Sequence, residues 1–257
     1  MRLRPLEEAR SLSTARFYGR WYRHRRPVVI RDAAASWPAL SRWTDPYLIE
    51  RVGDRLVVAY RMSAREVTLD PQTGFRQARL SLRQFMSGCS GAEEARYFMR
   101  ASLDHQLKAL ARDAPIPSFC QGGLELRRNL WASAKGMVTQ LHFDLPDNLI
   151  VQIRGTKRFT LFPPSQRPFL KPFPWLSSTP HLAGFDPIAA ASDGTPRPSG
   201  TFVTLSPGDA LYLPPRYWHH AVALQSTVSV NHWWCRPMTR VLLGLSDAYK
   251  RLRGLQI

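Results

Sequence analysis

The sequence lacks long apolar runs and holds few cysteines. No stretch reaches the roughly 18 apolar residues that a membrane-spanning helix needs, so we expect no membrane partner. The three cysteines (Cys89, Cys120 and Cys235) show no CxxC spacing, and no apolar signal segment follows Met1. These absences argue against a secreted disulfide framework and against a thiolate zinc cluster. We therefore expect a cytoplasmic protein.

Acidic residues are also scarce. The chain has 19 Asp and Glu against 36 Lys and Arg, which gives a formal net charge of +17. Only five of the basic residues are lysines, so arginine dominates the balance. A field of that sign attracts anionic partners such as RNA or acidic peptides. Solvated arginines spread over the whole surface would give the same balance, so both interpretations stay open.

The order of apolar patterns along the chain predicts a mainly β protein. Among its 257 residues, 44% are apolar, which is enough for a large core. Residues 1–128 predict short strands at 27–30 and 56–60 and helical segments at 12–21, 45–52, 81–86 and 103–111. After about Asn129, short β-like runs alternate with Gly, Pro and Asp turns, which predicts an antiparallel barrel or sandwich. These runs are 130–131, 139–143, 149–153, 158–162, 202–205, 210–213, 218–224 and 228–234.

Two segments depart from this rhythm. Residues 163–200 form a long loop rich in Pro and Ser, and loops of that length are usually functional, so the surfaces near Trp175 and Phe185 are candidate substrate contacts. Residues 238–255 predict a helix with Val241 and Leu245 on one apolar stripe. That stripe would pack on the barrel or against a second copy of the chain.

Two histidines and one aspartate are the first residues that suggest chemistry. His142 and Asp144 stand two positions apart in a predicted strand, so both side chains project from the same face. An isolated HxD is common by chance, but His219 in a later strand would complete two imidazoles and one carboxylate. That set is the facial triad that holds Fe(II) and leaves coordination positions open. His219 shares its strand face with small alanines, whereas His220 shares its face with bulky residues, so we select His219.

Lys157 lies in a position where its charge needs a partner. It alternates with Phe159 and Leu161, so its ammonium group belongs to a strand face that should be buried. A lone buried cation is costly and requires an anion. That anion is either a carboxylate of the protein or the distal carboxylate of an organic acid.

These motifs together resemble the cupin-like JmjC family. The resemblance rests on Thr139-x-x-His142-x-Asp144-x-x-x-Asn148, on Gly155-x-Lys157, and on the run from Gly208 to His219 that Val230-Asn231 follows. It extends to Arg26-Pro-Val-Val-Ile30 and to Tyr97-Phe-Met-Arg100. The family implies a double-stranded β-helix (jelly-roll or cupin) barrel with N-terminal helical elements and a C-terminal helix. Residues 1–257 would then be a single domain, with a supporting part at 1–128, a catalytic core at 129–237 and a helix at 238–257.

The resemblance also implies an activity and roles for named residues. Members of the family are Fe(II)- and 2-oxoglutarate-dependent oxygenases, among them protein hydroxylases and a hydroxylase of a tRNA base. By this resemblance His142, Asp144 and His219 are the catalytic iron ligands, and Lys157 pairs with the distal carboxylate of 2-oxoglutarate. The resemblance also implies that Thr139 and Tyr97 donate hydrogen bonds to the same carboxylate. Asn148 and Asn231 would line the pocket that holds 2-oxoglutarate.

The substrate is the least determined part of the prediction. A protein or peptide side chain is favoured, with succinate and carbon dioxide as co-products. RNA stays open because of the charge of +17 and because cations and aromatics mix between Arg16 and Arg26, as they do in single-stranded nucleic-acid sites. An amphipathic helix that buries Phe17 and Trp21 is the favoured interpretation of that patch. A metal-binding cupin without turnover is a third alternative, and a homodimer through residues 238–257 is a further expectation.

Overall fold

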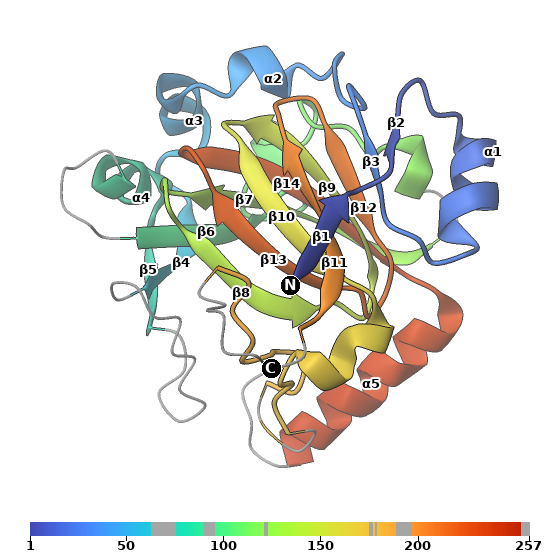
Figure 1. The fold of residues 1–257 in the computed structure, drawn as a ribbon. Coiled ribbons are helices and arrows are strands. Elements are labelled where there is room, and N and C mark those ends of the chain that lie inside the picture. Colours follow the sequence, from blue (N-terminus) through green and yellow to red (C-terminus); the bar gives the residue numbers. More distant parts are fainter. Residues whose placement is uncertain are drawn as a thin grey trace.

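The structure is a computed structural model that describes residues 1–62, 76–89, 96–120, 123–174, 177, 179–188 and 197–252. Two sheets form its centre (Figure 1). The first sheet has the order β1 (Arg2–Pro5), β11 (Ser199–Leu205), β10 (Lys157–Phe162), β13 (Trp218–Ala223) and β8 (Val138–Phe143). The second has the order β2 (Glu8–Ala9), β3 (Val28–Ile30), β12 (Ala210–Leu213), β9 (Asp147–Arg154), β14 (Thr227–Cys235), β7 (Leu124–Ser133), β6 (Arg96–Ser102), β4 (Leu56–Met62) and β5 (Arg76–Ser81).

The strands from β7 to β14 form the double-stranded β-helix that the resemblance implied. Successive strands alternate between the two sheets, except for β10 and β11, which are antiparallel neighbours in the first sheet. All eight β-like runs predicted after Asn129 coincide with strands, although β7 begins earlier, at Leu124. The mainly β prediction is therefore confirmed, because short β-like runs separated by turn residues favour short antiparallel strands.

Apolar residues fill the space between the two sheets. Phe159 and Leu161 of β10, Leu211 and Leu213 of β12, and Ile150 of β9 belong to one buried cluster. Cross-strand pairs such as Leu211 with Ile150 in the second sheet, and Phe159 with Ala221 in the first, place these side chains on the facing sides. The barrel thus has a packed apolar core, and buried polar side chains such as Asn148, Asn231 and Lys157 also enter its interior.

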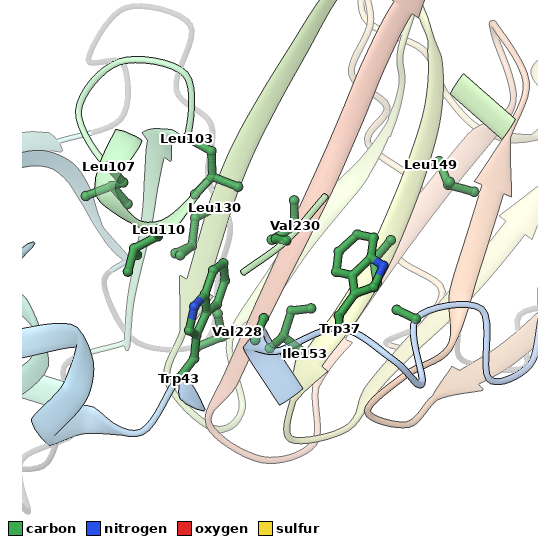
Figure 2. Packing of buried hydrophobic residues seen from close by; sticks show 14 of the residues in the cluster. Trp37, Trp43, Leu103, Leu107, Leu110, Leu130, Leu149, Ile153, Val228 and Val230 are labelled. Carbon is green, nitrogen blue, oxygen red and sulfur yellow. The ribbon is translucent and has the colours of Figure 1, made fainter. Parts of the chain in front are cut away.

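The N-terminal half covers the outer face of the second sheet. Helices α2 (Ala39–Arg42), α3 (Asp45–Val52) and α4 (Leu82–Cys89) and the 3-10 turns η2 (Lys108–Leu110) and η3 (Ser118–Cys120) surround a second, larger cluster. Figure 2 shows part of this cluster, where Trp37 and Trp43 lie among Ile153, Val228 and Val230 of the sheet. The helices predicted at 45–52 and 81–86 and the strands at 27–30 and 56–60 are confirmed.

The helix predicted at 103–111 is wrong. The segment holds only η2 and turns, although Leu103, Leu107 and Leu110 are all fully buried. Asp104 accepts hydrogen bonds from the backbone N–H and the guanidinium of Arg128, which draws the chain into a compact turn. Tertiary contacts have therefore overridden the helical spacing of the apolar residues.

The basic N-terminal patch is an amphipathic helical segment, as favoured above. α1 (Thr14–Phe17) is capped by the Ser13 side chain and continues as the π-helical turn η1 (Tyr18–Tyr22). Phe17 and Trp21 are buried in the outer cluster. Arg20 and Arg26 both pair with Glu7. The two rings are consequently not exposed for stacking on a nucleobase.

The C-terminal helix α5 (Pro237–Leu252) extends away from the barrel (Figure 1). Met238, Val241 and Leu245 are 70%, 58% and 64% exposed. Val241 and Leu245 of the predicted stripe therefore do not pack on the barrel, and pairing of the stripe with a second copy stays a prediction. Within the described ranges we find no helix with the length and apolarity to cross a membrane.

Candidate metal centre

The three predicted ligands lie together at one end of the barrel. His142 in β8 and His219 in β13 are directly opposite each other across the antiparallel pair, and Asp144 follows β8. One ligand atom from each residue lies within 4.8 Å of the other two. The centroids of the two imidazole rings are 4.1 Å apart, and Nε2 of His219 is 3.7 Å from Oδ2 of Asp144. These distances fit three donors around one small cation.

Backbone hydrogen bonds orient both imidazoles. Nδ1 of His142 lies 2.7 Å from the carbonyl oxygen of Gln140, and Nδ1 of His219 lies 3.1 Å from that of Tyr217. A carbonyl accepts only, so each Nδ1 carries the proton and each Nε2 keeps a lone pair. Burial and the neighbouring His142 lower the pKa of His219, which keeps this imidazole neutral. Neutral imidazoles with a free Nε2 are the form that binds metals.

Two further side chains orient the carboxylate of Asp144. Asn148 Nδ2 donates to Oδ2 at 2.9 Å, and the indole N–H of Trp233 donates to the same oxygen at 3.3 Å. The backbone N–H of Arg216, a residue with a positive φ of 65°, donates to the Asp144 carbonyl at 2.7 Å. This last bond ties the loop before β13 to the end of β8 and so brings His219 to Asp144.

Asn148 and Asn231 form part of a hydrogen-bonded chain. The indole N–H of Trp131 donates to Asn231 Oδ1 at 2.9 Å, and Asn231 Nδ2 donates to Asn148 Oδ1 at 3.4 Å. Asn148 then donates to Asp144. Both amides are buried, and the resemblance made them a pocket lining. Their hydrogen bonds also orient the carboxylate of Asp144.

A β-bulge places Thr139 on the same face as His142. His219 and Ala221 are two residues apart in β13, yet they pair with His142 and Thr139, which are three residues apart in β8. In a regular strand, residues three apart lie on opposite faces. Because Ala221 belongs to the interior cluster, its cross-strand partner Thr139 lies on the interior face. The three-residue spacing in the sequence therefore has a structural cause.

Lys157 enters the barrel from the first position of β10. It is 8% exposed, and its Nζ lies 5.8 Å from the ring centroid of Phe159 in the interior cluster. Burial lowers the pKa of Lys157 to about 8. Among the described residues, no carboxylate forms a salt bridge with this ammonium group. Of the two anions that the sequence left open, a bound organic carboxylate is therefore favoured.

The other histidines do not join the triad. His220 is buried on the opposite face of β13, next to Thr160 of β10, and burial lowers its pKa to about 4. His232 is buried on the far side of the second sheet and meets Trp37 edge to face. In the described ranges, the histidines and acids that could hold a metal ion are His142, Asp144 and His219.

The long loop contributes to the centre through its backbone. Its described part includes η4 (Pro164–Phe169) and a bridge of Leu182 to His142. Phe143 N–H donates to the His181 carbonyl, and Ala183 N–H donates to the Leu141 carbonyl. The segment thus fixes the free edge of β8 beside His142. Phe185 packs edge to face on Phe162, away from the triad, and Trp175 lies outside the described residues.

The remaining predicted residue, Tyr97, has its backbone in β6, but its side chain lies outside the described part of the chain. The neighbouring Phe98 and Arg100 both contact Trp131. Sequence reasoning assigned no role to Trp131 or Trp233. The available signal was alternation, because Asn231 and Trp233 stand two apart in a strand and share a face.

Comparison with known proteins assigns the fold and the family. This chain resembles the X-ray structure of E. coli ycfD with a TM-score of 0.54 and 18% sequence identity. The match covers 95% of this chain and 58% of that chain, and at this identity it supports the fold alone. Among curated proteins, the chain is 28% identical over 232 residues to Jumonji C domain-containing protein 5 of Drosophila melanogaster, covering 81% of this chain and 54% of that protein.

Two further relatives carry enzymatic or biosynthetic names. The human bifunctional peptidase and (3S)-lysyl hydroxylase JMJD7 is 26% identical, with 85% of this chain and 80% of that protein covered. The tRNA wybutosine-synthesizing protein 5 of Danio rerio is 26% identical, with 83% and 70% covered. The chain spans about half the length of the first curated relatives that it matches. The model of the cupin-like domain matches residues 14–240. This chain therefore belongs to the family of cupin-like JmjC domains.

Proposed function

We propose that the protein is an Fe(II)- and 2-oxoglutarate-dependent dioxygenase that hydroxylates a C–H bond in a protein or peptide side chain. The observation that carries this proposal is the triad of His142, Asp144 and His219, whose donor atoms lie within 4.8 Å of one another. Two neutral imidazoles and one carboxylate suit ferrous iron and occupy one side of its coordination sphere. A structural zinc site would close the sphere with a fourth protein ligand.

Lys157 supports the assignment of the co-substrate. Its ammonium group is buried inside the barrel and has no carboxylate partner among the described residues. It would pair with the distal carboxylate of 2-oxoglutarate, with a hydrogen bond from the Thr139 hydroxyl on the same interior face and one from Tyr97. Asn148 and Asn231 would line the pocket and hold Asp144. When bound, iron with 2-oxoglutarate and dioxygen supplies the oxidising power for hydroxylation, and succinate and carbon dioxide are the co-products.

The protein's own contribution is orientation of the donor groups. The carbonyls of Gln140 and Tyr217 hold the Nδ1 protons and so aim both Nε2 lone pairs at one point. Trp233 and Asn148 hold the carboxylate by its Oδ2 atom. Leu161 lies opposite His219 across the β10–β13 pair, and together with Phe159 it gives the buried imidazole an apolar neighbourhood that strengthens charge interactions on this side.

A peptide is favoured over RNA as the substrate. The name of the human relative as a (3S)-lysyl hydroxylase supports a protein side chain, whereas the zebrafish wybutosine-synthesizing relative keeps a tRNA base as the alternative. The patch between Arg16 and Arg26, which favoured RNA in the sequence, buries Phe17 and Trp21. Without those rings the patch lacks the stacking surface of single-stranded nucleic-acid sites.

Two measurements test the proposal. The purified protein should form succinate from 2-oxoglutarate only with ferrous iron and dioxygen, and His142→Ala should abolish this while His105→Ala, an exposed control, should not. Mass spectrometry of cellular peptide and RNA pools incubated with the protein should show the gain of one oxygen in peptides. A gain in RNA alone would establish the alternative substrate. Absence of succinate under all conditions would leave a metal-binding cupin without turnover.

A further inference from the structure

The second sheet extends beyond the barrel, and its inner face continues away from the metal centre. Strands β6, β4 and β5 lie on the left of Figure 1 and lengthen the sheet past β7. One cross-strand row runs through Ser229, Trp131, Arg100, Val58 and Arg79, from β14 to β5. Residues paired in this way share one face of a sheet. The row therefore leads from the inner wall of the barrel to the outside.

Trp131 connects this face to the metal centre. Its indole N–H begins the hydrogen-bonded chain through Asn231 and Asn148 to Asp144. Its ring also meets Trp233 edge to face at 6.3 Å, and Trp233 donates to Asp144 directly. A molecule lying on these two indoles would thus lie beside the triad.

Two arginines on this face, Arg100 and Arg127, lie beside the indoles of Trp131 and Trp233. The guanidinium of Arg100 lies 6.0 Å from the ring centroid of Trp131, and Arg127 is the cross-strand neighbour of Trp233. Both are exposed, and neither forms a salt bridge with a carboxylate of the described residues. Arg128, the next residue on the opposite face, does pair with Asp104.

The face carries no described carboxylate of its own. Besides the arginines and indoles, the described side chains of β4, β5, β6 and β7 that the register places on it are Phe98, Ser102, Asn129, Ser133, Val58, Leu56 and Ser81. In its described part, this surface has cations and aromatic rings and no acid, which complements an anionic partner. The net charge of +17 adds attraction at longer range.

The ring contacts favour a peptide over a nucleic acid. Trp131 is stacked with Phe98 at 6.1 Å, is approached by the guanidinium of Arg100, and meets the edge of Trp233. A nucleobase would need an open face of the Trp131 ring for stacking. A carboxylate needs only the guanidinium of Arg100, which the Trp131 ring holds in position. An arginine is also the side chain best suited to bind a carboxylate through two hydrogen bonds.

We propose that the face formed by Arg100, Arg127, Trp131 and Trp233 binds an acidic peptide segment, with Arg100 and Arg127 pairing with its carboxylates. This deepens the proposed function and rests on it, because such a segment would present the oxidised side chain to the triad. Acidic residues next to the target residue are then the specificity determinant of the substrate.

The test is a binding measurement that does not depend on turnover. Three fluorescein-labelled probes are titrated with the full chain in the presence of Mn(II), and fluorescence anisotropy is recorded. They are a decapeptide of alternating glutamate and alanine, its glutamine counterpart, and a ten-nucleotide oligouridylate. The glutamate peptide should bind more tightly than the glutamine peptide. Arg100→Gln and Arg127→Gln should each weaken glutamate-peptide binding about fivefold, as expected for exposed ion pairs.

Arg158→Gln is the matched control. Arg158 is also exposed and lies over an aromatic ring, at 5.0 Å from the Phe202 centroid, but on the outer side of the first sheet. This variant should bind the glutamate peptide like the wild type. Equal losses in all three variants would overturn the proposal, and so would tight binding of the oligouridylate with no binding of the glutamate peptide. Failure of the proposed function would appear separately, as absence of iron-dependent succinate formation in the wild type.

Discussion

Replacement of Lys157 by methionine should raise the free energy of unfolding and should abolish the binding of 2-oxoglutarate. The lysine is 8% exposed and extends into an apolar interior where Phe159 is its aromatic neighbour. Methionine has a similar length and carries no charge, so it fills the same space without the cost of burying an ammonium group. The same change removes the cation that would bind the distal carboxylate of the co-substrate.

The size of the gain follows from the pKa of the lysine. Burial lowers that pKa from 10.5 to about 8. At about 1.4 kcal/mol for each pH unit, this corresponds to roughly 3 kcal/mol of unfolding free energy at pH 7. Between pH 8 and 10.5 the unfolded chain binds more protons than the folded chain, so wild-type stability rises with pH. The advantage of Lys157→Met should therefore shrink to roughly 1 kcal/mol at about pH 9.5.

The assay is urea unfolding of the ligand-free protein at pH 7 and pH 9.5, with thermal shifts by 2-oxoglutarate and Mn(II) measured in parallel. Lys108→Met, at an exposed lysine of η2, is the control and should change neither stability nor the thermal shift. The wild type should gain thermal stability from 2-oxoglutarate, and Lys157→Met should not. A variant that is less stable than the wild type at both pH values, or one that 2-oxoglutarate still stabilises, would refute the reasoning.

Three further predictions concern the metal centre, the core and the C-terminal helix. Trp233→Phe removes the N–H that donates to Asp144, so Mn(II) affinity measured by calorimetry should fall about tenfold, and an unchanged affinity would mean that this bond does not orient the ligand. Asp147→Asn deprives Arg236 of its buried carboxylate and should cost about 3 kcal/mol in urea unfolding, whereas an unchanged midpoint would contradict a structural pair. Leu245→Asp on the exposed face of α5 should convert a dimer to a monomer in sedimentation velocity, and a monomeric wild type would disprove the homodimer.

The strands of the barrel could be predicted from the sequence because their pattern is local. The run at 139–143 mixes polar and apolar residues, the run at 210–213 is apolar throughout, turn residues follow both, and both are strands. Where local pattern and tertiary contacts disagreed, the contacts prevailed. Leu103, Leu107 and Leu110 have helical spacing, but the ion pair of Asp104 with Arg128 holds their segment in turns.

The residue types of the metal centre were also present in the sequence, since HxD in a strand places both side chains on one face. Their convergence with His219 depends on register. His142 lies opposite His219 because β8 and β13 pair antiparallel across more than seventy residues of intervening chain. The bulge that turns Thr139 toward the interior has the same origin, because it exists only in the paired strands.

By itself, therefore, the sequence determined the fold class, the family and the candidate ligands, because periodicity and motif spacing are properties of the chain. Only the tertiary structure decided that Phe17 and Trp21 are buried and that hydrogen bonds through two asparagines link Trp131 to Asp144. It also decided which arginines have carboxylate partners. Burial and pairing depend on residues far apart in the chain, and no local pattern contains them.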